Sequence, residues 1–110
     1  MAEHFKGRVD TFEIWNEPET ETFGGGKERT AEEYSKLVKA AYTAIKSVNA
    51  EATVIAGVTA PLSGSGSRKF LGEFLNIDNI ENYMDAVSVH PYGGDDYYAD
   101  EDDFNYFRTF

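Results

Sequence analysis

Residues 12–18 read FEIWNEP and give the strongest local signal in the chain. Residues 9–15 are mostly apolar and β-favouring, a pattern typical of a strand that lies within a sheet. Pro18 has no backbone N–H to donate to a neighbouring strand, so the strand must end before it. The sequence therefore predicts a strand over residues 9–15, with Asn16 and Glu17 at its carboxyl end.

Helix and strand signals alternate downstream of this strand. Thr30 and Glu33 have the spacing of a capping box, which predicts a helix that runs to about Asn49. The apolar face of this helix comprises Tyr34, Leu37, Val38, Ala41, Tyr42, Ile45 and Val48. Residues 53–58 and 86–89 are short runs of β-branched and small apolar side chains, as found in parallel sheets.

The remaining predicted elements are short. Ser67 is the expected cap of a short helix, and residues 77–83 are expected to form a turn or half-helix. Residues 2–6 have the pattern of a final helical turn closed by Gly7, because glycine accepts the left-handed conformation after a helix end. Residues 104–110 are expected to begin another helix.

The order strand, helix, strand, helix, strand predicts an α/β fold with a parallel sheet, because parallel strands need long crossover connections. Ligand chemistry in such folds gathers at the carboxyl ends of the strands. Asn16 and Glu17 follow the first predicted strand, Thr59 ends the second, and His90 and Tyr92 follow the third. We therefore expect the side chains of Asn16, Glu17, His90 and Tyr92 to converge at one end of the sheet, with the helices on one face.

Composition excludes several classes of function. Acidic residues outnumber basic ones 20 to 10 among 110 residues, which gives a net charge of -10. This charge argues against nucleic acid and against an anionic membrane surface as partners. The absence of cysteine excludes a disulfide framework and a thiol nucleophile. No apolar run approaches the roughly 20 residues of a membrane span, residues 1–10 lack the apolar core of a signal peptide, and the cellular location stays open.

Glu17 is the first candidate for catalysis. A carboxyl at a strand end, beside the indole of Trp15 and the amide of Asn16, is in a position where its pKa can be raised. A general acid needs such a raised pKa to keep its proton near neutral pH. The alternative is an ordinary surface carboxylate in the loop after a strand.

Two motifs resemble those of a known group of enzymes. The stretch FEIWNEP at residues 12–18 resembles the strand-four signature of the clan A glycoside hydrolases, which are retaining enzymes built on (β/α)8 barrels. The stretch VSVHPY at residues 87–92 resembles the strand-six end of the same clan, and one predicted strand lies between the two motifs. Within the clan, the chain is most similar to family thirty-nine, which includes β-xylosidases.

The resemblance implies a role for each matched residue. It implies that Glu17 is the general acid/base and that Asn16 contacts the sugar 2-hydroxyl and the nucleophile. It further implies that His90 and Tyr92 shape the glycone subsite, and Trp15 is either a subsite wall or a packing residue. The expected reaction is hydrolysis of O-glycosyl bonds in a β-linked oligosaccharide, polysaccharide or glycoside, by a retaining double displacement without a cofactor.

The resemblance also implies that the chain is only part of such an enzyme. Residues 1–110 correspond to the central portion of a TIM-barrel catalytic domain, roughly strands four to six. A retaining glycosidase needs a second carboxylate about 5 to 5.5 Å from the first, and in the clan this nucleophile ends strand seven. None of Glu73, Glu81 or Glu101 follows a suitable later strand. We therefore expect the nucleophile to be missing from this chain and the isolated chain to be inactive.

Two further interpretations remain open. A noncatalytic carbohydrate-binding module would use the same strand ends, and a structural barrel segment would associate with a second copy or with a complementing segment. Association is expected because a piece of a barrel leaves two sheet edges unpaired. Two alternatives are also open for Glu13. It either faces the barrel interior and pairs with a basic residue from another strand, or it lies exposed at an unpaired edge of the sheet.

No metal site is expected. His4 and His90 are the only histidines and do not have the spacing of a ligand pair. The acidic residues 95–103 lack the EF-hand spacing and are expected to form a solvated loop. Gly24, Gly25 and Gly26 do not form a phosphate-binding loop and are expected to form a lid or a plain connector.

Overall fold

The computed structural model describes residues 1–62, 64–93, 98–99 and 105. The elements, in chain order, are α1 (Ala2–Phe5), β1 (Thr11–Glu13), α2 (Ala31–Val48), β2 (Thr53–Thr59), α3 (Ser65–Leu75), the 3-10 helix η1 (Ile80–Tyr83), β3 (Ala86–Val89), β4 (Tyr92–Gly93) and β5 (Tyr98–Ala99). The predictions for residues 95–103 and 104–110 fall almost wholly outside the described residues.

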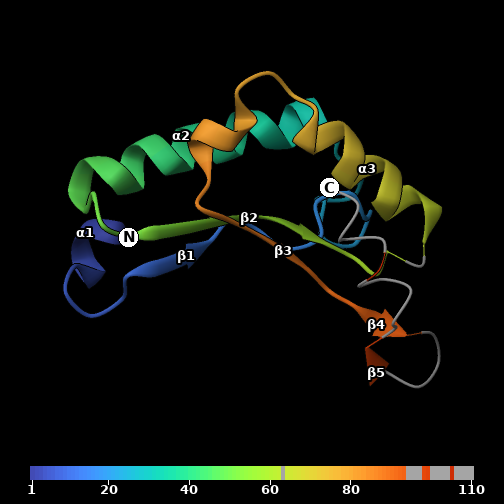
Figure 1. Ribbon diagram of the computed structural model, residues 1–110, viewed down its shortest axis with the longest axis horizontal. Coiled ribbons are helices and arrows are strands. Elements are labelled where there is room, and N and C mark those ends of the chain that lie inside the picture. Colours follow the sequence, from blue (N-terminus) through green and yellow to red (C-terminus); the bar gives the residue numbers. More distant parts are fainter. Residues whose placement is uncertain (63, 94–97, 100–104, 106–110) are drawn as a thin grey trace.

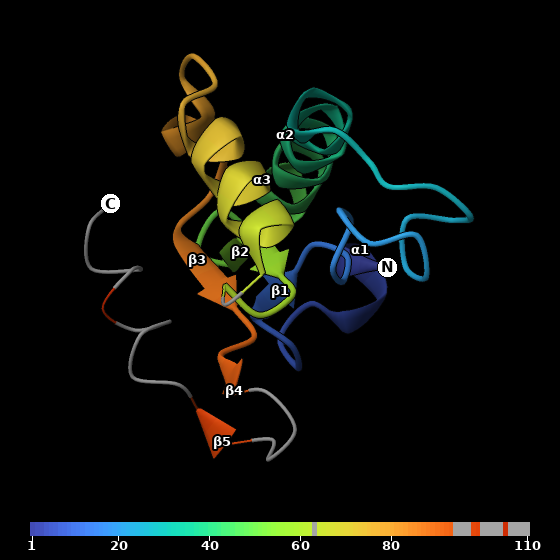
Figure 2. The ribbon, with the colours of Figure 1, turned by 90° about the vertical axis from the view of Figure 1, so that its right-hand side faces the viewer.

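The main sheet has three strands in the order β1-β2-β3, and both pairings are parallel. The helices α2 and α3 lie side by side over one face of this sheet (Figures 1 and 2). The predicted α/β class, the three adjacent parallel strands and the placement of the helices are therefore confirmed. The pair β4 and β5 is antiparallel and lies away from the helix layer.

The core lies between the sheet and the two helices. Val54 and Ala56 of β2 are fully buried on the helix-covered face, as expected for alternate residues of a strand. Tyr34 of α2 packs there against Phe74 and Phe70 of α3, with ring centroids 5.0 Å and 5.8 Å apart. These aromatic contacts fix both helices on the sheet and so hold the strand ends in place.

The start of α2 matches the prediction. The Thr30 hydroxyl accepts a hydrogen bond from the Glu33 backbone N–H, and the Glu33 carboxylate accepts one from the Thr30 N–H. Leu37 departs from the predicted apolar face, because 41% of its surface is exposed on the flank of α2. The helix therefore buries a narrower stripe than its apolar pattern suggests.

Two further predictions differ from the structure. The cap predicted at Ser67 is wrong, since α3 begins at Ser65 after Gly64 and the Ser67 side chain is buried. The strand predicted over residues 9–15 is shorter and covers only Thr11–Glu13. Trp15 leaves the extended conformation with a φ of 70°, which ends the regular ladder two residues earlier than the apolar pattern suggests.

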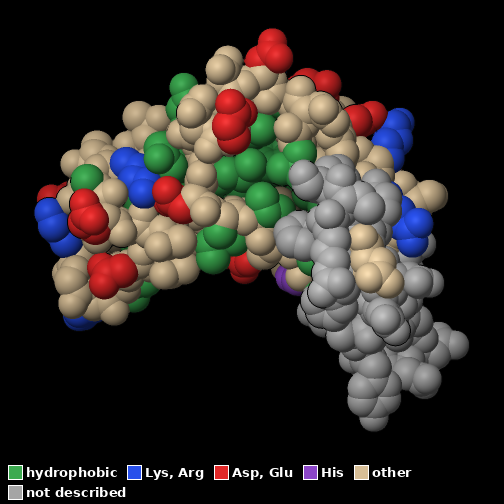
Figure 3. Space-filling view, viewed as in Figure 1, with side chains coloured by type: hydrophobic (Ala, Val, Ile, Leu, Met, Phe, Trp, Pro, Cys, Tyr) green, Lys and Arg blue, Asp and Glu red, His purple; other side chains and the backbone are tan. Residues whose placement is uncertain are grey.

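Charged side chains are spread over the outer surface. Figure 3 shows acidic side chains scattered around a band of exposed hydrophobic side chains on one face of the molecule. Among the described residues, no helix has the length and apolar character needed to cross a membrane.

Candidate active site

The end of β2 holds the two motif segments together. The Glu17 backbone N–H donates to the Val58 carbonyl at 2.8 Å, and the His90 N–H donates to the Thr59 carbonyl at 2.9 Å. Since β2 lies between β1 and β3, these bonds bring the residues that follow the outer strands to the same end of the sheet. Convergence at the carboxyl ends is confirmed for Glu17 and His90.

The side chains of these two residues are in direct contact. Glu17 Oε1 lies 2.6 Å from His90 Nδ1, and the side chains are 15% and 22% exposed, respectively. A contact of this length at a partly buried site is a strong hydrogen bond, because little water competes for either partner. The carboxyl group of Glu17 is therefore held in one orientation, with its second oxygen left for another partner.

The backbone at this end of the sheet is strained. Trp15, Glu17 and Val58 have φ values of 70°, 42° and 43°, which are unusual for residues other than glycine and most of all for a β-branched valine. The pairing of β2 with β3 also shifts register between Gly57 and Thr59. Irregularities of this kind re-aim side chains and cluster at functional sites. Their presence beside Glu17 indicates that this end of the sheet is the candidate functional site.

Gly57 makes the irregularity sterically feasible. Its φ is 94°, and a Cβ at this position would lie 2.8 Å from Val87 Cγ1 and 2.9 Å from the Ser88 carbonyl oxygen. Only glycine fits such a conformation and such a close approach of two strands.

The other predicted site residues lie around the Glu17–His90 pair in different ways. Asn16 is half-buried directly before Glu17. Trp15 is 57% exposed, and its Nε1 donates to the Phe23 carbonyl at 2.9 Å. The backbone of Tyr92 begins β4 two residues after His90, and its side chain lies outside the described structure.

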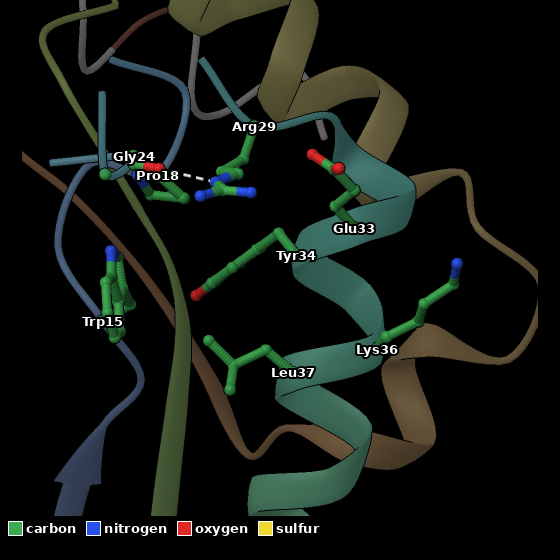
Figure 4. Close-up of a pocket in the computed structure, with 9 residues that line it drawn as sticks. Trp15, Pro18, Gly24, Arg29, Glu33, Tyr34, Lys36 and Leu37 are labelled. Carbon is green, nitrogen blue, oxygen red and sulfur yellow. Dashed lines mark hydrogen bonds between the residues drawn. The ribbon is translucent and has the colours of Figure 1, made fainter. Parts of the chain in front are cut away.

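A groove lies between Trp15 and one side of α2. Figure 4 shows Trp15 on one wall and Tyr34 and Leu37 of α2 on the other, with Arg29 at one end. The groove has a volume of about 490 Å³, and Glu17 does not line it. Trp15 therefore lines the open groove between β1 and α2, and its role as a subsite wall stays a prediction.

The structure places Glu13 and gives it a partner, while its pairing with a basic residue of another strand stays a prediction. Glu13 is exposed on the helix-free face, and its Oε1 accepts a hydrogen bond from the Ser88 hydroxyl at 2.7 Å. This contact joins the outer strands β1 and β3 across β2. Within the described ranges, no group of three or more His, Asp or Glu side chains is placed to hold a metal ion.

Sequence reasoning missed Glu19. Its Oε1 accepts the Ala60 N–H at 2.7 Å, directly after β2. Burial raises the pKa of Glu19 and the nearby Glu17 carboxylate raises it further, while hydrogen bonds from the backbone and from Ser67 oppose the shift. The second carboxylate two residues after Glu17 is the sequence signal that could have identified it.

The fold and this site define a parallel α/β protein with a hydrogen-bonded carboxyl group at the carboxyl ends of its strands, the arrangement from which TIM-barrel glycosidases are built. The family model of the glycosyl hydrolases family 39 matches residues 7–105, so the chain belongs to that family. This finding confirms the resemblance and makes the protein a glycoside hydrolase at the level of the family, with a carbohydrate as the substrate class. It also implies a TIM-barrel-like fold for the three parallel strands. No solved structure matches the chain significantly.

Proposed function

We propose that residues 1–110 form the central portion of the catalytic barrel of a retaining β-glycosidase, corresponding to strands four to six, and that Glu17 is its general acid/base. The observation that carries this proposal is the contact of Glu17 Oε1 with His90 Nδ1 at the strand ends. Family membership supports the reaction class, and the strained turn around Glu17 supports the location.

The proposed reaction has two steps. In the first, protonated Glu17 donates its proton to the glycosidic oxygen while a nucleophilic carboxylate attacks the anomeric carbon, so that the glycosidic bond breaks and a glycosyl-enzyme ester forms. In the second, the Glu17 carboxylate takes a proton from water, and the resulting hydroxyl attacks the same carbon and displaces the nucleophile. Glu17 thus ends each cycle protonated, as it began.

His90 is suited to orient Glu17 in both steps. When Nδ1 carries its proton, it donates to Oε1 whether Glu17 is a carboxylate or a carboxylic acid. The proton to be transferred then resides on Oε2, which is the oxygen that the 2.6 Å contact leaves for the substrate. Asn16, Trp15 and Tyr92 complete the proposed sugar contacts.

We assign the nucleophile to none of the described residues. Glu19 lies at the same end of the sheet, but its Oε1 is bound to the Ala60 N–H and the group is held beside Glu17 by the chain itself. A nucleophile must approach the anomeric carbon from the face opposite the leaving group. We therefore expect the 110-residue chain alone to release no product from an aryl β-glycoside.

The test is complementation. The chain is mixed with, or fused to, a family 39 segment that supplies a strand ending in glutamate, and hydrolysis of an aryl β-glycoside is measured. Activity should appear only in the mixture and should fall by about 100-fold or more in Glu17→Gln. Glu21→Gln, which changes an exposed carboxylate in the same loop, is the matched control and should keep full activity. Equal rates for Glu17→Gln and the parent mixture would contradict the proposal.

Association through the flank of β1 is a second candidate function that one observation favours. Val9, Trp15, Phe23 and Leu37 are large apolar residues with 39% to 57% of their surfaces exposed, and Trp15 and Leu37 line the same groove. Exposed apolar patches of this kind usually mark interaction surfaces. A self-associating chain should show a mass that rises with concentration in sedimentation equilibrium. Leu37→Glu should reduce this rise, whereas Ala40→Glu, on an exposed part of the same helix, should not.

A further inference from the structure

The turn that carries Glu17 is attached to β2 at two points. At the first, the Glu17 N–H donates to the Val58 carbonyl at 2.8 Å. At the second, Glu19 Oε1 accepts the Ala60 N–H at 2.7 Å. Within the turn, both the N–H and the hydroxyl of Thr20 donate to the Glu17 carbonyl, at 3.0 Å and 2.9 Å. The side chain of Glu19 is thus the only side chain among these contacts that ties the turn to the sheet.

This attachment is needed because the turn is strained. Glu17 has a φ of 42°, and a residue other than glycine keeps such a conformation only where surrounding contacts hold it. Loss of the bond from Glu19 to Ala60 would leave the turn joined to β2 through a single backbone bond. Glu17 could then relax to an ordinary conformation and withdraw from His90.

The environment of Glu19 argues against a purely stabilising role. Its Oε2 is buried and has no hydrogen-bond partner among the described residues. Burial of a carboxylate oxygen without a hydrogen-bond partner costs free energy. A glutamine could accept the same N–H without burying a charge. This unfavourable placement is therefore better explained by the bond that Glu19 Oε1 makes to the Ala60 N–H, which holds the turn of Glu17 against the end of β2.

We propose that Glu19 is a positioning residue for Glu17: its carboxylate accepts the Ala60 N–H and so fixes the turn that holds Glu17 against His90. The inference rests on the proposed role of Glu17 as the general acid. A general acid benefits directly, because its carboxyl group must keep a fixed orientation toward the leaving oxygen.

Two variants separate the bond from the charge. Glu19→Gln keeps an oxygen that accepts the Ala60 N–H but removes the charge, whereas Glu19→Ala removes both. The readouts are the ¹⁵N shift of His90 Nδ1 and the ¹³C shift of the Glu17 carboxyl carbon, both measured by NMR on the full 110-residue chain. Glu21→Gln is the control for the loss of one exposed negative charge in the same loop.

The expected results differ between the variants. In Glu19→Gln, both shifts should stay as in the parent, because the Ala60 N–H keeps its acceptor. In Glu19→Ala, the hydrogen-bonded Nδ1 signal should be lost while the methyl signals of the buried Val54 and Leu71 stay unchanged. Glu21→Gln should change neither readout. An unchanged Nδ1 signal in Glu19→Ala, or a lost Nδ1 signal in Glu19→Gln, would overturn the proposal.

These measurements are independent of catalysis. If complementation shows that Glu17 is not the acid, the NMR experiment still reports whether Glu19 positions it. If the NMR readouts do not respond, the assignment of Glu17 as the acid is still tested by the activity of Glu17→Gln.

Discussion

Glu17 Oε1 and His90 Nδ1 lie 2.6 Å apart, although 73 residues separate them in the sequence. The two residues follow different strands, β1 and β3, which are not paired with each other. β2 lies between their strands and accepts a backbone hydrogen bond from each of them. This contact makes His90 an orienting partner of the proposed acid. The role is additional to the sugar contact that the resemblance implies for His90.

Removal of His90 should therefore impair catalysis more than folding. In the complemented enzyme, His90→Ala should lower kcat by about 10-fold to 100-fold, because the Glu17 carboxyl loses its fixed orientation. The melting temperature should change little, since the side chain is partly exposed. His4→Ala, which alters the other histidine on the exposed surface of α1, serves as the control. A kcat for His90→Ala equal to that of the control would refute the orienting role.

The close approach of β2 and β3 at Gly57 gives a prediction on stability. Gly57→Ala should destabilise the protein by about 2 kcal/mol or more, since the added Cβ meets Val87 and Ser88 in a left-handed conformation. Gly26 has a φ of 84° with nothing within 4 Å, so Gly26→Ala should show only the conformational penalty, about 1 kcal/mol. Urea unfolding of both variants measures the difference, and equal losses would show that the steric contact is unimportant.

Tyr34 links the helix layer to the segment that precedes the site. Its buried hydroxyl donates to the Ile14 carbonyl at 2.7 Å, and burial raises its pKa well above the ordinary value. Tyr34→Phe should destabilise the fold by about 1 to 3 kcal/mol, because the carbonyl loses its donor away from water. Tyr42→Phe, on the same helix but only partly buried, should cost less than half as much in the same unfolding experiment.

A partly exposed ion pair should contribute to the loss of thermal stability at acidic pH. Lys46 Nζ lies 2.8 Å from Asp85 Oδ2, and this hydrogen bond, with that of the Val54 N–H, lowers the pKa of Asp85 below its ordinary 3.8. The contribution of Asp85 is thus fully present above its unfolded pKa and is lost as the pH falls through the lower folded pKa. The melting temperature of the parent should drop more steeply over that acidic window than that of Asp85→Asn. Identical slopes would contradict this, and Asp78→Asn, at an exposed site, should behave as the parent.

The sequence predicted those parts of the fold that depend on local pattern. The three strands, the capping box at Thr30 and Glu33, and the meeting of Glu17 with His90 follow from periodicity and from the geometry of parallel sheets. The departures come from tertiary contacts. Ser67 is buried near Glu19 instead of capping α3, and Leu37 is exposed because none of the described elements covers that flank of α2.

The backbone conformation and the contacts of the site were harder to predict from the sequence. The positive φ values at Trp15 and Glu17 could not be predicted, because both residues disfavour that conformation when considered alone. The contact of Glu19 with Ala60 could not be predicted from the local sequence either. A carboxylate in a loop after a strand is usually solvated, and only the bond to Ala60, 41 residues away, shows that this one is tied to the sheet.

The central claim is that Glu17 protonates the leaving group, and the dependence of the rate on the leaving group tests it most directly. In the complemented enzyme, Glu17→Gln should cut kcat/KM severely for an alkyl glycoside, whose leaving oxygen needs a proton, and much less for a dinitrophenyl glycoside, whose leaving group departs without one. The ratio of the two losses should be about 100-fold or more. Equal losses for both substrates would contradict the account and would exclude Glu17 as the general acid.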